Sequence, residues 1–451
     1  MNHMPHLPNS IEARDIAYHF HSNTNARLHE EIGPMVMEKG DGIYVEDNTG
    51  KRYIEALGGL WSVALGFGEK RLAQAAYDQM VKLPYYHTFG HKAHGPVVEL
   101  AEKLIGMAPV PMSKVYFTNS GSEANDTAIK MIWYRSNALG QPQRKKIISR
   151  VKGYHGVTIA AASLTGLPNN QRSFDLPIAG ILHTTCPHYR TTKQEGETEE
   201  MFSKRCAAEL EEMILREGPE TVAAFFAEPV MGAGGVIPPP KGYWEEIQPV
   251  LKKYDIIFVA DEVICGFGRT GEKFGTITYK LEPDIMTVSK QLSSSYFPIS
   301  ALLFNDKVYQ PIADESKKIG VFGHGYTASG HPVAAAVALE NLKIIEERDL
   351  FNHVKEIAPQ FQRRLHQLGK HGLAIETRGV GLIGAVEFAH ESLSATPGKL
   401  GGMINAQFAE AGLISRNMGD SLAFCPPMII TAKQVDEMFD RAEKALSNVR
   451  V

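Results

Sequence analysis

Short apolar runs alternate with longer stretches of helical periodicity through the middle of the chain. Strands that are apolar on both faces, and therefore buried, are predicted at 114–118, 146–150, 222–228, 256–261, 285–289 and 299–304. Helical patterns lie between them at 123–137, 203–216 and 244–254. This alternation predicts an α/β fold with a mostly parallel sheet between helices, in which ligands bind beyond the carboxyl ends of the strands.

The two ends of the chain have a different pattern. Residues 40–56 contain two alternating runs around an AsnThrGly turn, which is typical of a β-hairpin. Long amphipathic helical patterns occupy 332–347 and 432–449. We therefore expect a large domain over 66–331, and a smaller α+β domain built from both flanks, 1–65 and 332–451.

Composition favours a sizeable enzyme over a binding module. The chain has 451 residues, of which 43% are hydrophobic and 22% are charged, enough to bury one large core and a smaller one. The net charge is −4, and no basic stripe marks a nucleic-acid surface, so small metabolites are the expected partners.

The sequence also bears on location. The first ten residues lack the charged and apolar regions of a secretory signal or anchor, and no run of 18 apolar residues predicts a transmembrane helix. The cysteines are far apart and form no CxxC pair, which argues against a disulfide framework or a zinc site at Cys186, Cys206, Cys265 and Cys425. A cytoplasmic location is expected.

Lys290 is the first candidate for chemistry. It stands among small, apolar and hydroxyl residues at 287–300, downstream of Asp261, which ends an apolar run. An amine acts as a nucleophile only when unprotonated, and the pKa of an exposed lysine is about 10.4, so burial or a cationic neighbour must lower it. Taken alone, Lys290 could equally be a surface lysine in a Ser-rich loop, and Asp261 a cap for the next turn.

Two further segments could hold an anion. Ser120, Gly121 and Ser122 follow a strand and open a helix, where small residues and the helix N-terminus favour a phosphate, although an ordinary capped helix start has the same appearance. Thr327 lies among glycines at 323–332, where it could bind phosphate or belong to an unremarkable flexible loop.

Aromatic and histidine side chains add weaker signals. Tyr154, in GlyTyrHisGly after a strand, could stack on a heteroaromatic ring or be a packed loop tyrosine. His324 and His331 are seven positions apart, with no acid or cysteine between them, and this does not match a usual metal-ligand pattern. No metal is expected there.

Together these segments resemble the class III aminotransferase family of pyridoxal-phosphate enzymes, which have the fold type I architecture. The motifs stand in the order and at the spacing of the family, and the resemblance covers nearly the whole chain. It is carried by GlyLeuTrpSerVal at 59–63, AsnSerGlySerGluAlaAsnAsp at 119–126, GlyTyrHisGly at 153–156, AlaGluProValMetGlyAlaGlyGlyVal at 227–236, AspGluValIleCysGlyPheGlyArgThrGly at 261–271, the lysine segment at 287–300 and HisGlyTyrThrAlaSerGlyHisPro at 324–332.

The resemblance implies pyridoxal 5′-phosphate as the cofactor. Lys290 would form the internal aldimine and then move the proton between the substrate carbon and the cofactor carbon. Asp261 would keep the pyridine nitrogen protonated, which makes the ring an electron sink. Tyr154 and Val263 would cover the two faces of the ring, and Glu228 would support the cofactor indirectly.

The phosphate is held in this family by residues that match Ser120, Gly121 and Ser122, and by a threonine from the second subunit that matches Thr327. A homodimer is therefore implied, because a monomer would have an incomplete site. Whether dimers pair into tetramers stays open.

Within the family, the chain looks similar to the amine:pyruvate and ω-amino-acid:pyruvate branch. Arg416 matches the arginine that binds the keto-acid carboxylate as a bidentate fork and swings out when an apolar amine enters. A solvated turn arginine is the alternative. The substrate pocket would be lined by Trp61, Phe89, Tyr154 and Val157.

Three departures from the family pattern concern this site. Residues 21–25, HisSerAsnThrAsn with Asn23 at the centre, replace a HisProPheThr-like segment, and Gly90 stands where some relatives have a second phenylalanine. Both would leave the pocket wider or more polar. Gln291 replaces a common glycine or asparagine after the lysine, with no consequence that the sequence reveals.

The resemblance predicts an ω-transaminase that passes nitrogen from an amine or ω-amino acid to pyruvate or a similar keto acid, by a ping-pong mechanism through pyridoxamine phosphate. An aminomutase or decarboxylase of the same fold would keep Lys290 and Asp261 but would not pass nitrogen to a second carbonyl compound. A non-catalytic binding protein is the other alternative, and the intact lysine, acid and phosphate loop argue against it.

Overall fold

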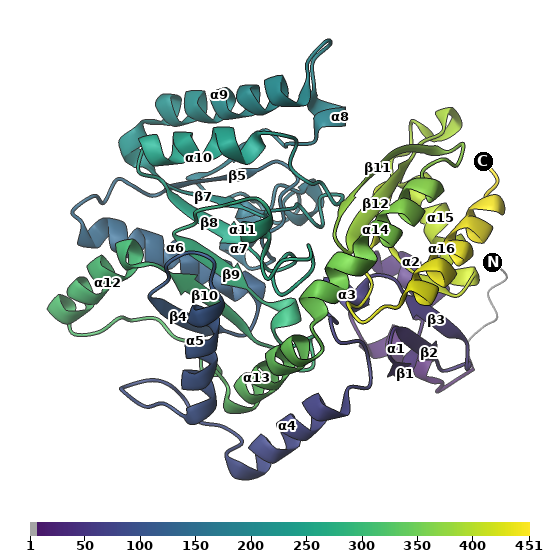
Figure 1. The fold of residues 1–451 in the computed structure, drawn as a ribbon, viewed down its shortest axis with the longest axis horizontal. Helices are drawn as coiled ribbons and strands as arrows, with labels where there is room; N and C mark the ends of the chain where they lie inside the picture. The colour runs from purple at the N-terminus through teal and green to yellow at the C-terminus, as the bar shows by residue number, and fades with distance from the viewer. Residues whose placement is uncertain (1–6) are drawn as a thin grey trace.

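The computed structural model describes residues 7–451, and a seven-stranded sheet lies at its centre (Figure 1). The strand order is β4-β10-β9-β8-β7-β5-β6, and only β10 runs antiparallel to its neighbours. The strands are β4 (Lys114–Thr118), β5 (Lys146–Arg150), β6 (Ile181–Thr184), β7 (Val222–Ala227), β8 (Ile257–Asp261), β9 (Ile285–Val288) and β10 (Ser300–Phe304). The predicted mostly parallel sheet is confirmed.

Each face of this sheet is covered by its own set of helices (Figure 1). Adjacent residues of a strand point to opposite faces, so Phe225 packs toward one layer and Phe226 toward the other. The first layer consists of α5 (Gly95–Met107), α9 (Glu199–Glu217), α10 (Tyr243–Lys253) and α13 (Pro332–Glu347), and the second of α6 (Gly121–Ala138), α7 (Ile159–Leu164) and α12 (Asp306–Ile319). Burial on both faces explains why an inner strand such as β7 is apolar throughout.

Two smaller sheets involve the flanks of the chain. One has the order β1-β2-β3-β13 and joins β1 (Met37–Asp41), β2 (Tyr44–Asp47), β3 (Arg52–Glu55) and β13 (Leu413–Ile414). The other has the order β11-β12-β15-β14 and joins β11 (Ala374–Val380), β12 (Ile383–Phe388), β15 (Ser421–Phe424) and β14 (Arg416–Met418). The hairpin expected at 40–56 corresponds to β2 and β3, with β1 added at its edge.

The remaining helices complete the chain. They are α1 (Ile11–Tyr18), α2 (Ala26–Ile32), α3 (Gly58–Trp61), α4 (Lys70–Lys82), α8 (Tyr189–Thr192), α11 (Gly275–Thr278), α14 (Leu350–Leu368), α15 (Lys399–Glu410) and α16 (Ala432–Ser447). A capping box between Thr431 and Gln434 fixes the start of α16, whose apolar face packs with α14 in a second core that other elements of the flanks share. The domain limits at 65/66 and 331/332 stay a prediction.

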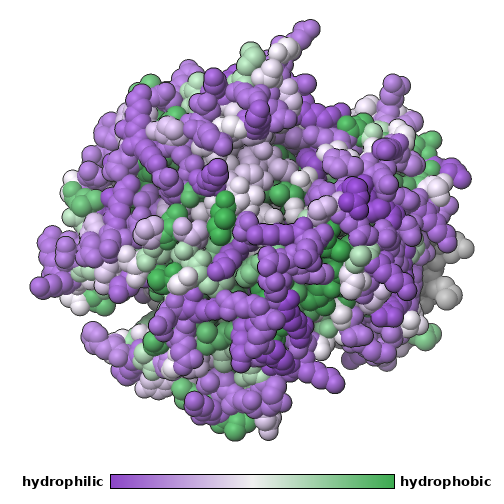
Figure 2. All heavy atoms as spheres, viewed as in Figure 1, coloured by the Kyte–Doolittle hydropathy of each residue, from purple (hydrophilic) through white to green (hydrophobic). Residues whose placement is uncertain are grey.

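Polar residues cover most of the face shown in Figure 2, and apolar residues show chiefly toward its middle. Within 7–451, no helix is both long enough and apolar enough to span a bilayer. Residues 1–6 belong to the N-terminal segment that is expected to carry neither signal nor anchor, and they lie outside the described part of the chain.

Candidate functional site

A cavity of about 140 Å³ lies where β7, β8 and β9 end and α6 begins. This is the carboxyl edge of the parallel strands, where ligands bind in open α/β sheets. The cavity contains an amine, acids, small residues and an aromatic ring. Its walls are formed by Gly121, Ser122, Asn125, Tyr154, His155, Gly156, Glu228, Asp261, Val263, Ile264, Ser289 and Lys290.

Lys290 begins a single 3-10 turn, Lys290–Leu292, directly after β9. Its φ of 44° lies in the left-handed region, where a non-glycine residue is strained, and such residues gather at functional sites. Burial lowers the pKa of Lys290 to about 8, although the nearby charge of Asp261 acts to raise it. About a tenth of the amine is therefore neutral at pH 7, far more than at the ordinary pKa of lysine, and the neutral form is the nucleophile.

Asp261 ends β8 and is buried in a polar network. Its Oδ2 accepts a hydrogen bond from Asn125 Nδ2 at 2.9 Å and lies 2.8 Å from His155 Nδ1. Its Oδ1 accepts one from the backbone N–H of Val263 at 3.2 Å. Partners on both oxygens hold the carboxylate in one orientation at the cavity wall.

Glu228 connects two loops at the cavity. Oε1 accepts a hydrogen bond from the N–H of Tyr154 at 3.0 Å, and Oε2 accepts one from the N–H of Gly232 at 2.9 Å. Burial raises the pKa of Glu228 and also that of Tyr154. Glu228 therefore fixes the loop that carries Tyr154, which fits the indirect support expected from the sequence.

The start of α6 forms another wall of the cavity. Ser120 is the N-cap, and its Oγ accepts a hydrogen bond from the N–H of Glu123 at 3.2 Å. Gly121 and Ser122 line the cavity and Ser120 does not, so the capping interpretation accounts for Ser120 in this structure. A Cβ added to Gly121 would lie 3.2 Å from Val263 Cγ2, and one added to Gly156 would lie 2.5 Å from Ser122 Oγ.

Gln291 has a structural contact that the sequence did not reveal. It is fully buried, and its Nε2 donates to the carbonyl of Ile264 at 3.1 Å. The side chain of Asn341, from α13, donates to the backbone carbonyl of Gln291 at 2.8 Å. Gln291 therefore joins the turn of Lys290 to the segment that carries Val263 and Ile264.

Arg416 and Trp61 lie outside the cavity wall. Arg416 starts β14 and is half-buried, and its charge acts on both Tyr154 and Lys290. Trp61 is fully buried in an apolar cluster that also contains Ile264, a residue of the cavity wall. The structure thus places Arg416 within electrostatic reach of the site and Trp61 behind one wall of it.

Val157 and Asn23 meet in a separate groove of about 950 Å³. One wall of the groove is formed by residues 20–25 and the other by residues that include Val157, whose side chain is 65% exposed. The N–H of Val157 donates to Ser122 Oγ at 3.0 Å, so the groove adjoins the cavity. Residues 21–25, where the sequence departs from the family pattern, therefore line the same groove as Val157.

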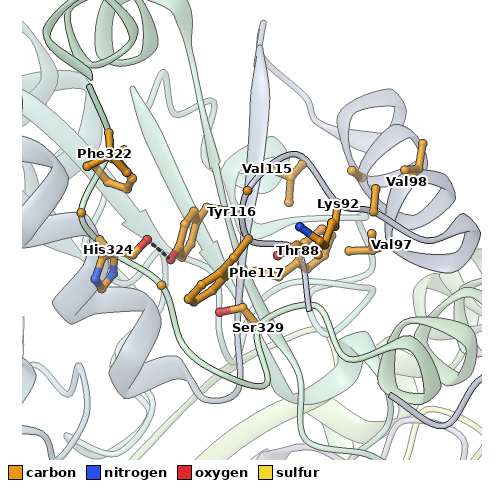
Figure 3. Close-up of a pocket in the computed structure, with 17 residues that line it drawn as sticks. Thr88, Lys92, Val97, Val98, Val115, Tyr116, Phe117, Phe322, His324 and Ser329 are labelled. Carbon is orange, nitrogen blue, oxygen red and sulfur yellow. Dashed lines mark hydrogen bonds between the residues drawn. The ribbon is translucent and has the colours of Figure 1, made fainter. Parts of the chain in front are cut away.

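Phe89 and Thr327 lie near a third hollow, of about 860 Å³, part of which is drawn in Figure 3. Phe89 and Gly90 line it together with the segment 321–325, where the carbonyl of His324 accepts a hydrogen bond from Tyr116 at 3.3 Å. Thr327 is exposed, and its carbonyl accepts a hydrogen bond from Tyr85 at 2.7 Å. Neither Phe89 nor Thr327 lines the 140 Å³ cavity of the same chain.

The two histidines considered for a metal have separate contacts. His324 Nε2 lies 2.9 Å from Thr127 Oγ1 and its Nδ1 lies 2.8 Å from Lys130 Nζ. His331 is the N-cap of α13. His324 and His331 therefore contact different segments of the fold.

Asn125 and His155 are the residues of the network that sequence reasoning missed. Both stand inside quoted motifs, at 119–126 and 153–156. The signal was available, because a buried acid at a strand end requires polar partners, and these two residues are the polar neighbours that the motifs offer. Their contact with Asp261 depends on segments 106 and 136 positions away.

The cavity fits pyridoxal phosphate. The carboxylate of Asp261 suits a protonated ring nitrogen, the amine of Lys290 suits an aldehyde, and the N-terminus of α6 with its close-packed glycine suits a phosphate. A Cβ at Gly121 would crowd this space against Val263, so glycine favours the close approach of an anion.

Comparisons with known proteins agree with this geometry. The family described as "Aminotransferase class-III" matches residues 25–446. The chain is 49% identical over 413 residues to gamma-aminobutyrate transaminase 1, mitochondrial, of Oryza sativa subsp. indica, covering 90% of this chain and 80% of that protein.

Two solved structures extend the likeness. An omega transaminase from Pseudomonas jessenii in complex with PMP is 57% identical, with a TM-score of 0.96, covering 97% of this chain and 98% of that one. A thermostable omega transaminase variant, substituted at a tryptophan, a phenylalanine and an arginine and engineered for asymmetric synthesis of enantiopure bulky amines, is also 57% identical, with a TM-score of 0.96, covering 97% and 99%. This chain therefore belongs to the class III aminotransferase family and is a pyridoxal-phosphate-dependent aminotransferase of fold type I.

Proposed function

We propose that this aminotransferase takes nitrogen from an amine or ω-amino acid and passes it to pyruvate or a similar keto acid. The observation that carries the proposal is the placement of Arg416, a half-buried cation whose charge reaches Lys290 and Tyr154. A cation beside the reacting amine suits a carboxylate substrate, because a guanidinium binds a carboxylate through two parallel hydrogen bonds.

The roles of the residues follow from their surroundings. Bound pyridoxal phosphate supplies a ring that accepts the electron pair left at the substrate carbon. With the cofactor bound, Lys290 would hold its aldehyde group through Nζ and would move the proton at the substrate carbon. Asp261, fixed by Asn125 and His155, would keep the ring nitrogen protonated.

The other residues position the cofactor. Tyr154 and Val263 would cover the ring, and Glu228 keeps the Tyr154 loop in place through its two carboxylate oxygens. Gly121 and Ser122 receive the phosphate at the start of α6, with Ser120 capping that helix.

Substrate size is set at the walls beyond the cofactor. Trp61, Phe89, Tyr154 and Val157 are the proposed lining. The omega transaminase variant engineered for bulky amines carries changes at a tryptophan, a phenylalanine and an arginine, the residue types of Trp61, Phe89 and Arg416. This supports a pocket in which those three types decide which amines enter.

The complete enzyme is a homodimer in this proposal, with Thr327 and Phe89 supplied to the site of the partner. Support comes from their position outside the cavity of their own chain. Exposed apolar side chains gather between α4 and this region and suit burial against a second copy, namely Tyr77, Met80, Val81, Tyr85, Tyr86 and Phe89. The proposed location is the cytoplasm, which suits four cysteines that are free and buried.

A half-reaction experiment tests the function. Purified enzyme is mixed with an amine donor without acceptor, and the cofactor spectrum is followed before and after pyruvate is added. A transaminase converts the cofactor to its stable amine form, and pyruvate then restores the aldehyde form. An aminomutase or decarboxylase that does not pass nitrogen on would leave the spectrum unchanged by pyruvate, and this result would overturn the proposal. A panel of donors and acceptors then identifies the preferred pair.

A further inference from the structure

Three histidines surround one aspartate at the N-terminal end of the described chain, far in sequence from the catalytic lysine. His19 Nδ1 lies 2.9 Å from Asp15 Oδ1, and His21 Nε2 lies 2.7 Å from Asp15 Oδ2. His29 Nε2 lies 3.0 Å from the same Oδ2. The imidazoles are close together, with ring centroids 4.4 Å apart for His19 and His21 and 4.1 Å apart for His21 and His29.

The arrangement matches the donor set of a borderline divalent metal. One ligand atom each from Asp15, His19 and His21 lies within 4.8 Å of the others. A tetrahedral zinc ion with bonds of about 2.0 to 2.1 Å keeps its ligand atoms roughly 3.3 Å apart, so these three side chains are near enough to share one ion after a small adjustment. Imidazole with a carboxylate favours Zn²⁺ and its neighbours Co²⁺ and Ni²⁺ over Mg²⁺ or Ca²⁺.

His29 has a different place in the cluster. Its side chain is 10% exposed, whereas that of His19 is 64% exposed. The contact of His29 with Asp15 Oδ2 is the kind of outer hydrogen bond that orients a metal-binding carboxylate. His19, on the solvent side, leaves the remaining coordination position open to water.

The helices α1 and α2 around this cluster bury few side chains. The described side chains of α1 include no buried one, and His29 is the buried residue of α2. Large apolar side chains of this segment are exposed instead, including Tyr18 at 88% and Phe20 at 85%. Since apolar burial does not fasten α1 to α2, the polar cluster is the principal link between them.

We propose that Asp15, His19 and His21 bind one divalent transition-metal ion of the Zn²⁺ class, with His29 positioning the carboxylate, and that the ion fastens α1 to α2. The ion would draw together residues of a helix, the following loop and the next helix, as structural metals do in segments with too little core. Residues 20–25 of the same segment form one wall of the groove that faces Val157. The metal therefore orders a wall that adjoins the active site without taking part in the chemistry.

Co²⁺ titration of the metal-free holoenzyme tests the site, because tetrahedral Co²⁺ has a visible d–d absorption at longer wavelength and far more intense than that of octahedral hydrated Co²⁺. We expect the band to saturate at one ion per chain and to be displaced by Zn²⁺. His21→Ala and Asp15→Asn should abolish it, while His29→Ala should weaken binding by about tenfold to a hundredfold. His366→Ala, which removes an exposed histidine of α14, is the matched control and should bind as the parent does.

Hydrogen exchange of residues 11–32, with and without Zn²⁺, tests the fastening. Slower exchange in the parent and in His366→Ala, but not in His21→Ala, would support the proposal. The absence of a tetrahedral Co²⁺ band in the parent would overturn the site, as would equal binding by the parent and His21→Ala. Binding without any change in exchange would overturn the fastening role. The parent titration needs no variant, so its outcome does not depend on whether a variant folds.

Discussion

Lys290 lies among the cavity walls after β9, and this burial disfavours its charged form, which lowers its pKa to about 8. A lysine with its ordinary pKa would be almost wholly protonated near neutral pH and unable to attack an aldehyde. The environment therefore favours the neutral amine of Lys290.

Replacing Lys290 with alanine should abolish turnover and the absorbance band of the lysine-bound cofactor, because no other amine lines the cavity among the described residues. Absorbance spectra and an activity assay check this. Lys204→Ala, which removes an exposed lysine of α9, should leave both unchanged. Full activity of the Lys290 variant would refute the assigned role.

The pH dependence of cofactor capture follows from the lowered pKa. Folding shifts the pKa of Lys290 downward, so half of the amine is neutral at a pH of about 8 and nearly all of it about one unit higher. The rate at which cofactor-free enzyme captures pyridoxal phosphate should therefore be half-maximal near a pH of about 8 and level off about one unit above it. A rate that keeps rising toward 10.5, the ordinary value of lysine, would show that Lys290 is not perturbed.

Arg416 should matter unequally in the two half-reactions. Arg416→Ala should slow the reaction with pyruvate more than the reaction with an apolar amine, since only the keto acid carries the carboxylate. Stopped-flow measurement of each half-reaction checks this. Arg363→Ala, which removes an exposed arginine of α14, controls for the loss of charge. Equal losses in both halves would contradict the proposed role.

At the scale of elements, the site depends on how closely the start of α6 approaches its neighbours. The loop after β5 brings Gly156 against Ser122, with φ of 134° at the glycine. Glu228 holds the same loop from the end of β7. The cavity is thus shaped by backbone contacts as much as by the chemical groups that line it.

Gly156→Ala should loosen the cofactor. A Cβ there would lie 2.5 Å from Ser122 Oγ, and the positive φ would add strain of about 1 to 3 kcal/mol. Gly140→Ala is a suitable control, because Gly140 also has positive φ, of 69°, but no atom lies within 4 Å of its added Cβ. Equilibrium binding of pyridoxal phosphate should weaken for the first variant and not for the second. Similar affinities would show that the contact is unimportant.

Most strands of the central sheet, and helix α13, could be predicted from the sequence. The pattern predicted β4, β5, β7, β8, β9 and β10 to within one or two residues, because buried parallel strands are apolar without interruption. It missed β6, an edge strand whose His183 and Thr184 break the apolar run. Helix α13 was predicted with its observed limits, since Pro332 marks its first turn.

Contacts between side chains that are distant in the sequence were harder to predict than the elements. The contact of His155 with Asp261, and the gathering of His19, His21 and His29 on Asp15, depend on segments brought together by folding. A motif names candidates, whereas only the fold decides which of them touch.

At the scale of the whole molecule, the proposed dimer makes each active site depend on two chains. Thr327→Ala and Lys290→Ala should each give an impaired enzyme. Mixed dimers should recover activity, because one of their two sites would combine Lys290 of one chain with Thr327 of the other. Activity assays on refolded or coexpressed mixtures check this. No recovery above the separate variants would place Thr327 within its own chain or outside the site.

The pairing of β3 with β13 has a consequence for synthesis of the protein. Ile54 lies beside Leu413, so the sheet that begins near residue 37 receives its last strand only when nearly the whole chain has been made. The seven strands of the central sheet all lie between 114 and 304. The central sheet can therefore assemble while the chain is still being translated, and β1 to β3 keep one edge open until β13 has been made.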